Sequence, residues 1–194
     1  MTNNSEQYAD CPIDSLKYQI AVYEDAAAYK SLFFCLFPSL QNFAFAILRS
    51  RQVAEETASD VLMEVWVRRK KLMGIENLKF YLFTSVRNAA LRKLKQENKA
   101  SRISLDNLEV EIISDYCNPE ENLRNNELEQ ELHRAIQQLP PRCKIIYKLA
   151  KEDKLRYAEI SELLGVSIKT IDNQLSIALQ KIAATIRLTR TKKS

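Results

Sequence analysis

The chain has almost no glycine: two residues among 194. Phosphate-binding loops need several glycines in a fixed spacing, and neither GxGxxG nor GxxxxGK[ST] occurs, so the usual nucleotide-binding sites are excluded. Sheets rich in hairpins also depend on glycine at their tight turns. Long runs of Leu, Ala, Glu, Lys and Ile instead predict an all-α protein.

Cysteine and histidine are scarce as well. The four cysteines lie far apart, without a CxxC pair, and His133 is the only histidine, so the spacing of a zinc site is absent. We expect Cys11, Cys35, Cys117 and Cys143 to be reduced, buried thiols. A single histidine without a nucleophile motif is more often structural than catalytic. The sequence therefore predicts no enzyme activity, no cofactor, no metal and no small-molecule substrate.

The N-terminus lacks the basic start and apolar core of a signal peptide. We also expect no stretch to approach the roughly 18 apolar residues that a membrane span needs. These two features predict a cytoplasmic protein.

Charge is unevenly distributed along the chain. Residues 81–102 hold six cations against one acid, residues 106–131 hold nine acids against one cation, and residues 144–194 hold eleven cations against five acids. This basic, acidic, basic order favours two nucleic-acid-binding modules joined by a segment that stays away from phosphates. The alternative is that the cations lie on ordinary solvated helix faces and that the acidic stretch is an ordinary linker.

Apolar periodicity predicts three helices in the N-terminal half. They run over about 31–48, 53–71 and 78–96, with a kink or a restart at Pro38 in the first. Gly74 breaks the chain before the third helix, and Asn77 is the expected N-cap. The third helix carries aromatic residues before its cations, a combination that binds unstacked bases and their phosphates. Equally, the aromatic residues could belong to the core.

The C-terminal half contains a helix-turn-helix pattern. Helices are expected at about 128–139 and 143–151, followed by one that starts at Tyr157 and ends at Gly165, and by a last one capped by Ser167. The last helix has a buried stripe of Ile171, Leu175, Ala178 and Ile182. Its opposite face holds Lys169, Asn173, Ser176 and Gln180, which are suited to base edges in a major groove. An ordinary helical hairpin with a solvated face is the alternative.

Two pairs of segments resemble a known family. LPPRCKIIYKL at 139–149 and YAEISELLGVSIKTIDNQLSIAL at 157–179 are similar to the fourth domain of bacterial RNA polymerase sigma factors. AEETASDVLMEVW at 54–66 and LKFYLFTSVRN at 78–88 are similar to the second domain. Their order, without a third domain between them, resembles the extracytoplasmic-function (ECF) class. The resemblance implies helical domains at 20–98 and 126–188, joined by an acidic linker at 99–125.

The resemblance also implies a function and its residues. The chain is expected to direct core RNA polymerase to promoters and to assist strand opening, with an anti-sigma factor as a further partner. Glu56 and Asp60 are expected to dock on the β′ clamp helices, and the outer side of the C-terminal domain on the β flap. The −10 element is assigned to Asn77, Lys79, Tyr81, Arg87, Asn88 and Arg92. The −35 element is assigned to Ser167, Lys169, Thr170, Asn173, Ser176 and Gln180.

Two other functions remain open at the level of sequence. A freestanding helix-turn-helix repressor or activator needs a dimer surface, and no heptad seam is visible. The second alternative function is that of a helical adaptor, which binds acidic partners through its basic faces.

Overall fold

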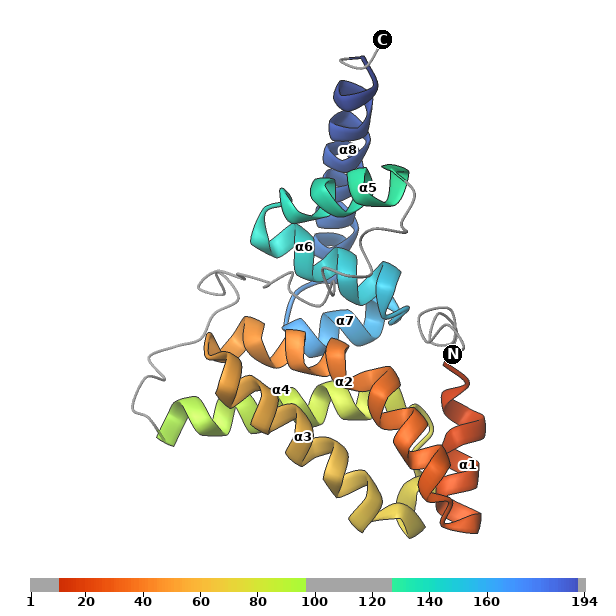
Figure 1. Ribbon diagram of the computed structural model, residues 1–194. Coiled ribbons are helices and arrows are strands. Elements are labelled where there is room, and N and C mark those ends of the chain that lie inside the picture. The colour runs from red at the N-terminus through yellow and green to blue at the C-terminus, as the bar shows by residue number, and fades with distance from the viewer. Residues whose placement is uncertain (1–10, 97–126, 192–194) are drawn as a thin grey trace. The chain divides into compact units, whose positions relative to one another are not determined.

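A computed structural model describes residues 11–96 and 127–191, and these residues form helices without a strand. The chain divides into two compact units, Met1–Ser101 and Arg102–Ser194 (Figure 1). The predicted all-α class with two helical domains is confirmed. The predicted linker at 99–125 lies outside the described residues.

The first unit is organised around one central helix. Its elements are α1 (Ile13–Tyr23), α2 (Ala26–Leu48), α3 (Arg51–Val67), the 3-10 helix η2 (Arg69–Gly74) and α4 (Leu78–Gln96). α2 packs against α1, α3 and α4, and α1 also packs against η2. Leu32, Leu36 and Leu40 of α2 are fully buried, together with Leu62 of α3 and Phe83 of α4. These contacts bury the faces that the periodicity predicted as apolar.

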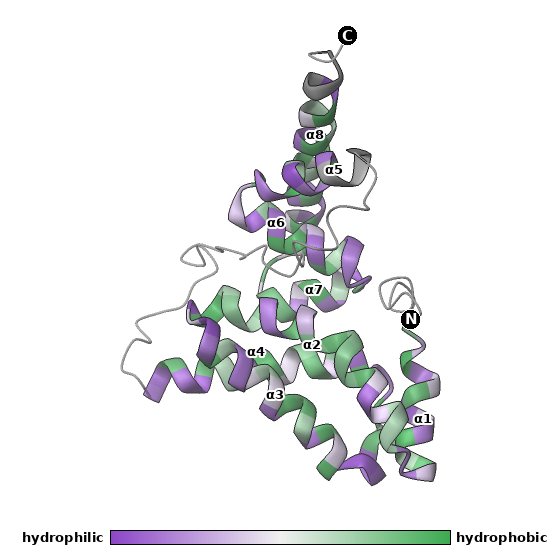
Figure 2. Cartoon of the chain, in the orientation of Figure 1, coloured by the Kyte–Doolittle hydropathy of each residue, from purple (hydrophilic) through white to green (hydrophobic). Residues whose placement is uncertain are grey.

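The expectation that no segment resembles a membrane span is wrong for α2. This 23-residue helix has a mean hydropathy of 1.6 over its most apolar window, enough by length and composition to span a bilayer (Figure 2). Its buried residues pack against α1, α3 and α4, so here it serves as the core helix of the first unit. α2 also continues through Pro38 as one helix, and the predicted restart does not occur. Packing on both sides of Pro38 offsets the lost backbone hydrogen bond.

The start of α4 agrees with the sequence, whereas the end of α3 does not. The amide of Phe80 donates to Asn77 Oδ1 over 3.0 Å, which makes Asn77 the N-cap as predicted. α3 was expected to reach about residue 71 but ends at Val67. The backbone tightens into η2, where the Lys71 amide donates to the Arg68 carbonyl over 2.8 Å and Leu72 is buried.

The expectation of four reduced, buried thiols needs correction. Cys11 and Cys35 form a disulfide between half-buried residues, with their Cα atoms 6.3 Å apart. Helix α1, which no sequence pattern predicted, packs on α2 and brings Cys11 next to a residue 24 positions away. Cys143 is a free, buried thiol, as expected. Cys117 lies outside the described residues.

The second unit is built on one long helix. Its elements are α5 (Glu127–Gln137), α6 (Pro141–Tyr147), the π-helix η4 (Lys148–Glu152), α7 (Tyr157–Leu164) and α8 (Ile168–Thr191). α8 packs against α5, α6 and α7. One core cluster joins α5 and α6 to α8 through Ala135, Ile136, Leu139, Cys143, Ala178 and Ile182. α8 is thus the surface on which the other helices of this unit are arranged.

Candidate nucleic-acid interfaces

A three-residue turn fixes how α8 leaves α7. Gly165 has φ +67°, the left-handed conformation that glycine adopts without strain, and its amide donates to the Ser161 carbonyl over 2.9 Å. The Ser161 hydroxyl donates to the Val166 carbonyl over 2.6 Å. The Thr170 amide then donates to Ser167 Oγ over 3.1 Å, which starts α8. The turn, its glycine and its N-cap all agree with the sequence prediction.

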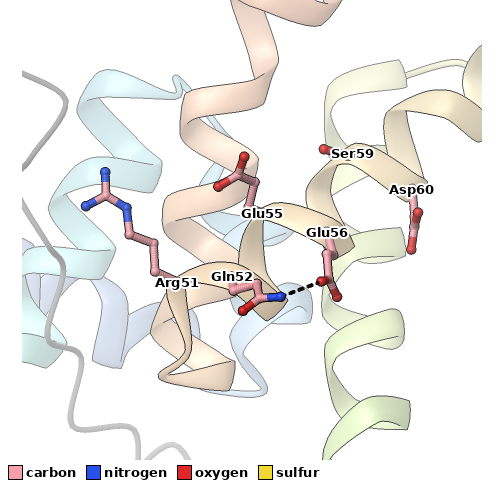
Figure 3. Close-up of a pocket in the computed structure, with 6 residues that line it drawn as sticks. All are labelled: Arg51, Gln52, Glu55, Glu56, Ser59 and Asp60. Atoms are coloured by element: carbon pink, nitrogen blue, oxygen red, sulfur yellow. Dashed lines mark hydrogen bonds between the residues drawn. The ribbon is translucent and has the colours of Figure 1, made fainter.

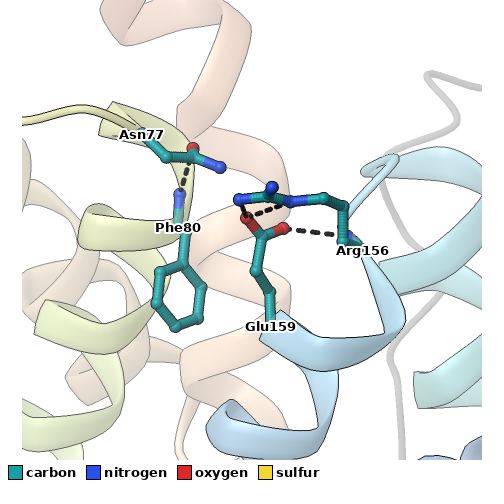
Figure 4. A network of polar contacts seen from close by, with 4 residues as sticks. All are labelled: Asn77, Phe80, Arg156 and Glu159. Atoms are coloured by element: carbon teal, nitrogen blue, oxygen red, sulfur yellow. Dashed lines mark hydrogen bonds and ion pairs between the residues drawn. The ribbon is translucent and has the colours of Figure 1, made fainter.

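The start of α7 is held by an acid that the sequence analysis did not single out. Glu159 is buried, and its carboxylate accepts from the Arg156 amide over 2.8 Å and from the Arg156 guanidinium over 2.6 and 2.9 Å (Figure 4). This contact satisfies a backbone amide at the helix start. A Glu three residues after the N-cap residue, as in a capping box, is the sequence signal that could have identified it. Arg156 itself stays largely exposed at the N-terminal end of α7.

The buried stripe of α8 determines which of its residues face outward. Ile171, Leu175, Ala178 and Ile182 are all buried, as predicted. Lys169, Asn173, Ser176 and Gln180 are all exposed on the other side of the helix. Ser167 and Thr170 differ from these four, because their hydroxyl groups lie 2.9 Å apart and form the N-cap.

α6 supports α8 from the buried side. The Cys143 thiol donates to Gln174 Oε1 over 3.1 Å, which directs that amide toward α6. Burial raises the pKa of Cys143, so the thiol keeps its proton near neutral pH and remains a donor. Next to it, burial lowers the pKa of Lys144, whose ammonium donates to Gln137 Oε1 over 3.3 Å. α6 therefore holds α8 through a polar contact as well as through the core.

In the first unit, α4 also separates a buried face from an exposed one. Leu78, Leu82, Phe83, Val86 and Ala90 are buried. Tyr81, Asn88 and Arg92, all exposed, are spaced i, i+7 and i+11, which places them along one stripe with Lys95. Tyr81 retains 41% of its surface exposed. This stripe combines an aromatic ring with cations.

The remaining residues predicted for the −10 element lie outside this stripe. Arg87 is half-buried and follows a different line along α4. Asn77 and Lys79 are half-buried at the start of the helix, where Asn77 Oδ1 is occupied as the cap. Phe83 is a core residue, with its ring 5.3 Å from that of Phe43. The interpretation of the aromatic residues as core is thus correct for Phe83 and wrong for Tyr81.

Comparison with known families covers both units. Residues 33–100 match Sigma-70 region 2, and residues 129–182 match Sigma-70, region 4. The chain belongs to the sigma-70 family of RNA polymerase sigma factors, in the ECF class. As a sigma factor it directs RNA polymerase to promoters at transcription initiation, which confirms the predicted function over the repressor and the adaptor.

Three similar proteins share 16–24% sequence identity with this chain. An ECF RNA polymerase sigma factor RpoE from Cereibacter sphaeroides is 24% identical over 172 residues, covering 87% of this chain and 91% of that protein. The structure of the sigma factor RpoE with the anti-sigma factor NepR from Bartonella quintana has a TM-score of 0.51 at 24% identity, over 82% of this chain and 96% of that one. CnrH with the cytosolic domain of CnrY has a TM-score of 0.46 at 16% identity, over 90% and 96%.

The sigma factor has a third polar surface, on α3. Arg51, Gln52, Glu55, Glu56, Ser59 and Asp60 line a pocket at the surface (Figure 3). Glu56 accepts from Gln52 over 3.3 Å and forms an ion pair of 3.8 Å with Lys93 of α4, whereas Asp60 is exposed one turn further along. Met63 and Val67 extend this face with 58% and 68% of their surfaces exposed. A face that combines acids with exposed apolar side chains is suited to a protein partner.

Proposed function

We propose that this sigma factor reads the −35 element as duplex with α8 and captures unstacked bases of the −10 element with α4 and the segment before it. One observation carries the proposal. In each family region, several of the residues assigned to DNA lie on one exposed helix face, opposite a buried stripe: Lys169, Asn173, Ser176 and Gln180 on α8, and Tyr81, Asn88 and Arg92 on α4. Capture of unstacked bases lowers the cost of strand opening, since opened bases regain stacking on the protein.

The α8 face supports recognition of duplex DNA. An α-helix fits the major groove, where Asn pairs with adenine and short polar side chains reach base edges. Asn173, Ser176 and Gln180 supply such groups, and Lys169 supplies a cation near the start of the helix. The N-terminus of α8 carries the positive end of the helix dipole, which favours a phosphate nearby. We assign Ser167 and Thr170 mainly to the cap that sets the angle of entry.

The α4 stripe supports capture of a single strand. Stacking on an aromatic side chain is worth about 1–3 kcal/mol per base. Tyr81 presents an exposed ring, and Arg92 and Lys95 place cations along the same side of the helix for the phosphates. Asn88 adds hydrogen-bonding groups between them. Arg87, Asn77 and Lys79 are proposed to contribute from the flank and from the start of the helix.

Protein partners are proposed for the remaining surfaces. Asp60, with Glu56 beside it, is assigned to the β′ clamp helices, and the second unit to the β flap. An anti-sigma factor is a further proposed partner, because the similar sigma factor RpoE is bound to NepR in its solved structure. We propose a cytoplasmic location, because core polymerase is the partner on which the protein acts.

The test is open-complex formation by holoenzyme containing the double variant Arg87→Ala/Arg92→Ala. Loss of two cations should reduce opening and flatten its salt dependence, whereas a premelted bubble should restore transcription because unstacking is already accomplished. Lys30→Ala/Lys151→Ala is a control, since it removes two exposed charges that lie outside α4, the segment before it and α8. Wild-type opening of closed duplex by the Arg variant, or no relative rescue by the bubble, would contradict the assignment of α4.

A further inference from the structure

The short segment between η2 and α4 is held by a lysine from α1. Lys17 Nζ donates to the Ile75 carbonyl over 2.9 Å and to the Glu76 carbonyl over 3.4 Å, and it lies 3.7 Å from Asp14 Oδ1. The ammonium thus has two backbone carbonyls as hydrogen-bond acceptors and one carboxylate as an ion-pair partner. The Lys17 side chain is only 12% exposed. Burying a lysine is costly unless it is paired, so this ammonium has a defined task at the two carbonyls.

The start of η2, which leads into this segment, is held by the residue that follows α1. Glu24, which directly follows α1, forms an ion pair of 2.8 Å with Arg69 at the start of η2 and one of 3.8 Å with Lys70. The Arg69 guanidinium also donates to the Trp66 carbonyl over 3.0 Å and lies over the Trp66 ring. The backbone from Arg69 to Glu76 is therefore attached to α1 at both ends.

α1 is itself attached to the central helix by the Cys11–Cys35 disulfide. Cys11 lies two residues before α1 begins, and Cys35 lies within α2. α1 has only 11 residues, and a helix of that length is marginal without tertiary contacts. The disulfide thus fixes the end of α1 that is nearer to Lys17 than to Glu24.

We propose that Lys17 is a positioning residue for the segment Gly74–Asn77, and that the Cys11–Cys35 disulfide sets how firmly α1 holds that segment for single-stranded DNA. This inference rests on the proposed role of the segment and of α4 in binding the −10 strand. Lys17 acts through the Ile75 and Glu76 carbonyls, directly before the Asn77 cap that starts α4.

The redox step is an ordinary thiol–disulfide exchange. A thiolate of Cys11 or Cys35 attacks a disulfide such as glutathione disulfide and forms a mixed disulfide; the second cysteine then displaces the remaining glutathione thiol. The protein dithiol is oxidised by two electrons, and one glutathione disulfide is reduced to two thiols. Both cysteines are half-buried, not fully enclosed. Disulfides in cytosolic proteins are usually transient and redox-sensing, in keeping with reversible exchange.

Lys17→Met removes the ammonium but keeps an unbranched apolar side chain of similar length, whereas Lys17→Arg keeps a positive charge with N–H donors. Holoenzyme binding is measured to a single-stranded non-template oligonucleotide from the −10 region of a promoter that the wild type transcribes. We expect Lys17→Met to weaken binding about tenfold, with partial recovery in Lys17→Arg and no change in binding of a −35 duplex. Amide exchange in a peptide spanning 72–79 should accelerate in Lys17→Met, which reports on the segment itself.

A second experiment measures binding of the same single-stranded oligonucleotide by wild type and by Cys11→Ser/Cys35→Ser, after treatment with dithiothreitol and after treatment with glutathione disulfide. Reduced wild type should lose about as much strand affinity as Lys17→Met, roughly tenfold, because both changes release the same carbonyls. The Ser pair should behave as reduced wild type under both treatments; it retains Cys143 as a control thiol. Reducing Lys17→Met should cause little further loss, since the two changes act on one contact.

Tyr81→Ala distinguishes failure of this inference from failure of the proposed function. If Tyr81→Ala weakens strand binding but Lys17→Met leaves both binding and amide exchange unchanged, the positioning role is overturned and the function of α4 stands. If the Ser pair responds to redox treatment as wild type does, the role of the disulfide is overturned. If neither Tyr81→Ala nor Lys17→Met affects strand binding, the proposed −10 site fails, and the inference fails with it.

Discussion

Replacing Gly165 by alanine tests whether the helix-turn-helix depends on a left-handed residue. Gly165 has φ +67°, and a Cβ added there meets no atom within 4 Å, so the substitution introduces no clash. An L-residue in this conformation costs about 1–2 kcal/mol. Alanine also restricts the unfolded chain, which returns about 0.4–1 kcal/mol. The expected result is a net loss of about 1 kcal/mol in the free energy of unfolding of the second unit.

Gly74 provides a matched control, because it is the only other glycine in the chain. It also has open space around an added Cβ, but its φ is not positive. Gly74→Ala should therefore leave stability unchanged or raise it by about 0.4–1 kcal/mol. Gly165→Asn should recover part of the loss at the first position, because asparagine tolerates the left-handed region better than alanine does.

The assay is urea unfolding followed by far-UV circular dichroism and by tryptophan fluorescence. Trp66 is the only tryptophan and lies in α3, so its fluorescence reports on the first unit alone. Gly165→Ala should lower the circular dichroism midpoint of the second unit and leave the Trp66 midpoint unchanged. An equal cost for Gly74→Ala, or none for Gly165→Ala, would refute the conformational explanation.

Three further predictions concern recognition, docking and pH. Asn173→Ala should lose about 1–3 kcal/mol of discrimination at one base pair of the −35 element; unchanged binding to all single-base variants of the duplex would remove Asn173 from the readout. Asp60→Arg should weaken co-purification with core polymerase at nearly unchanged melting temperature, because it reverses an exposed charge; undiminished co-purification would assign this face another role. The Arg69 guanidinium holds the pKa of Glu24 below its ordinary value of 4.5, so its stabilising effect is full above that pH and is lost as pH falls through the lowered pKa. The stability difference between Glu24→Gln and wild type in thermal unfolding should therefore disappear in acid, and a difference that persists there would contradict the ion pair.

Features with a local cause could be predicted from the sequence. The bounds of α4, its Asn77 cap, the Gly165 turn and the buried stripe of α8 follow from contacts within a few residues along the chain. Helical periodicity and capping encode such contacts directly. The exposed face of α8 follows from the same stripe, because side chains opposite a buried line must face outward.

Local patterns determined only in part which residues of α4 are buried and which are exposed. Sequence spacing alone left open whether the aromatic residues of α4 belong to the core; Phe83 does, where it packs against Phe43, whereas Tyr81 is exposed. Glu56 was predicted only as a docking residue, whereas its ion pair with Lys93 joins α3 to α4. Both outcomes depend on how neighbouring helices are arranged, which no periodicity within a single helix specifies.

Contacts between distant residues were decided by tertiary structure alone. Lys17 reaches the Ile75 carbonyl across 58 positions of sequence, and the Cys11–Cys35 disulfide exists because α1 packs on α2. Backbone carbonyls carry no residue-specific signal, and widely spaced cysteines do not reveal their pairing. The sequence by itself therefore determined most of the helices, the caps at Asn77, Gly165 and Ser167, and the family, because these depend on local patterns. The packing of α1 against α2 and η2 decided what holds the segment before α4, because that depends on contacts made only in the folded chain.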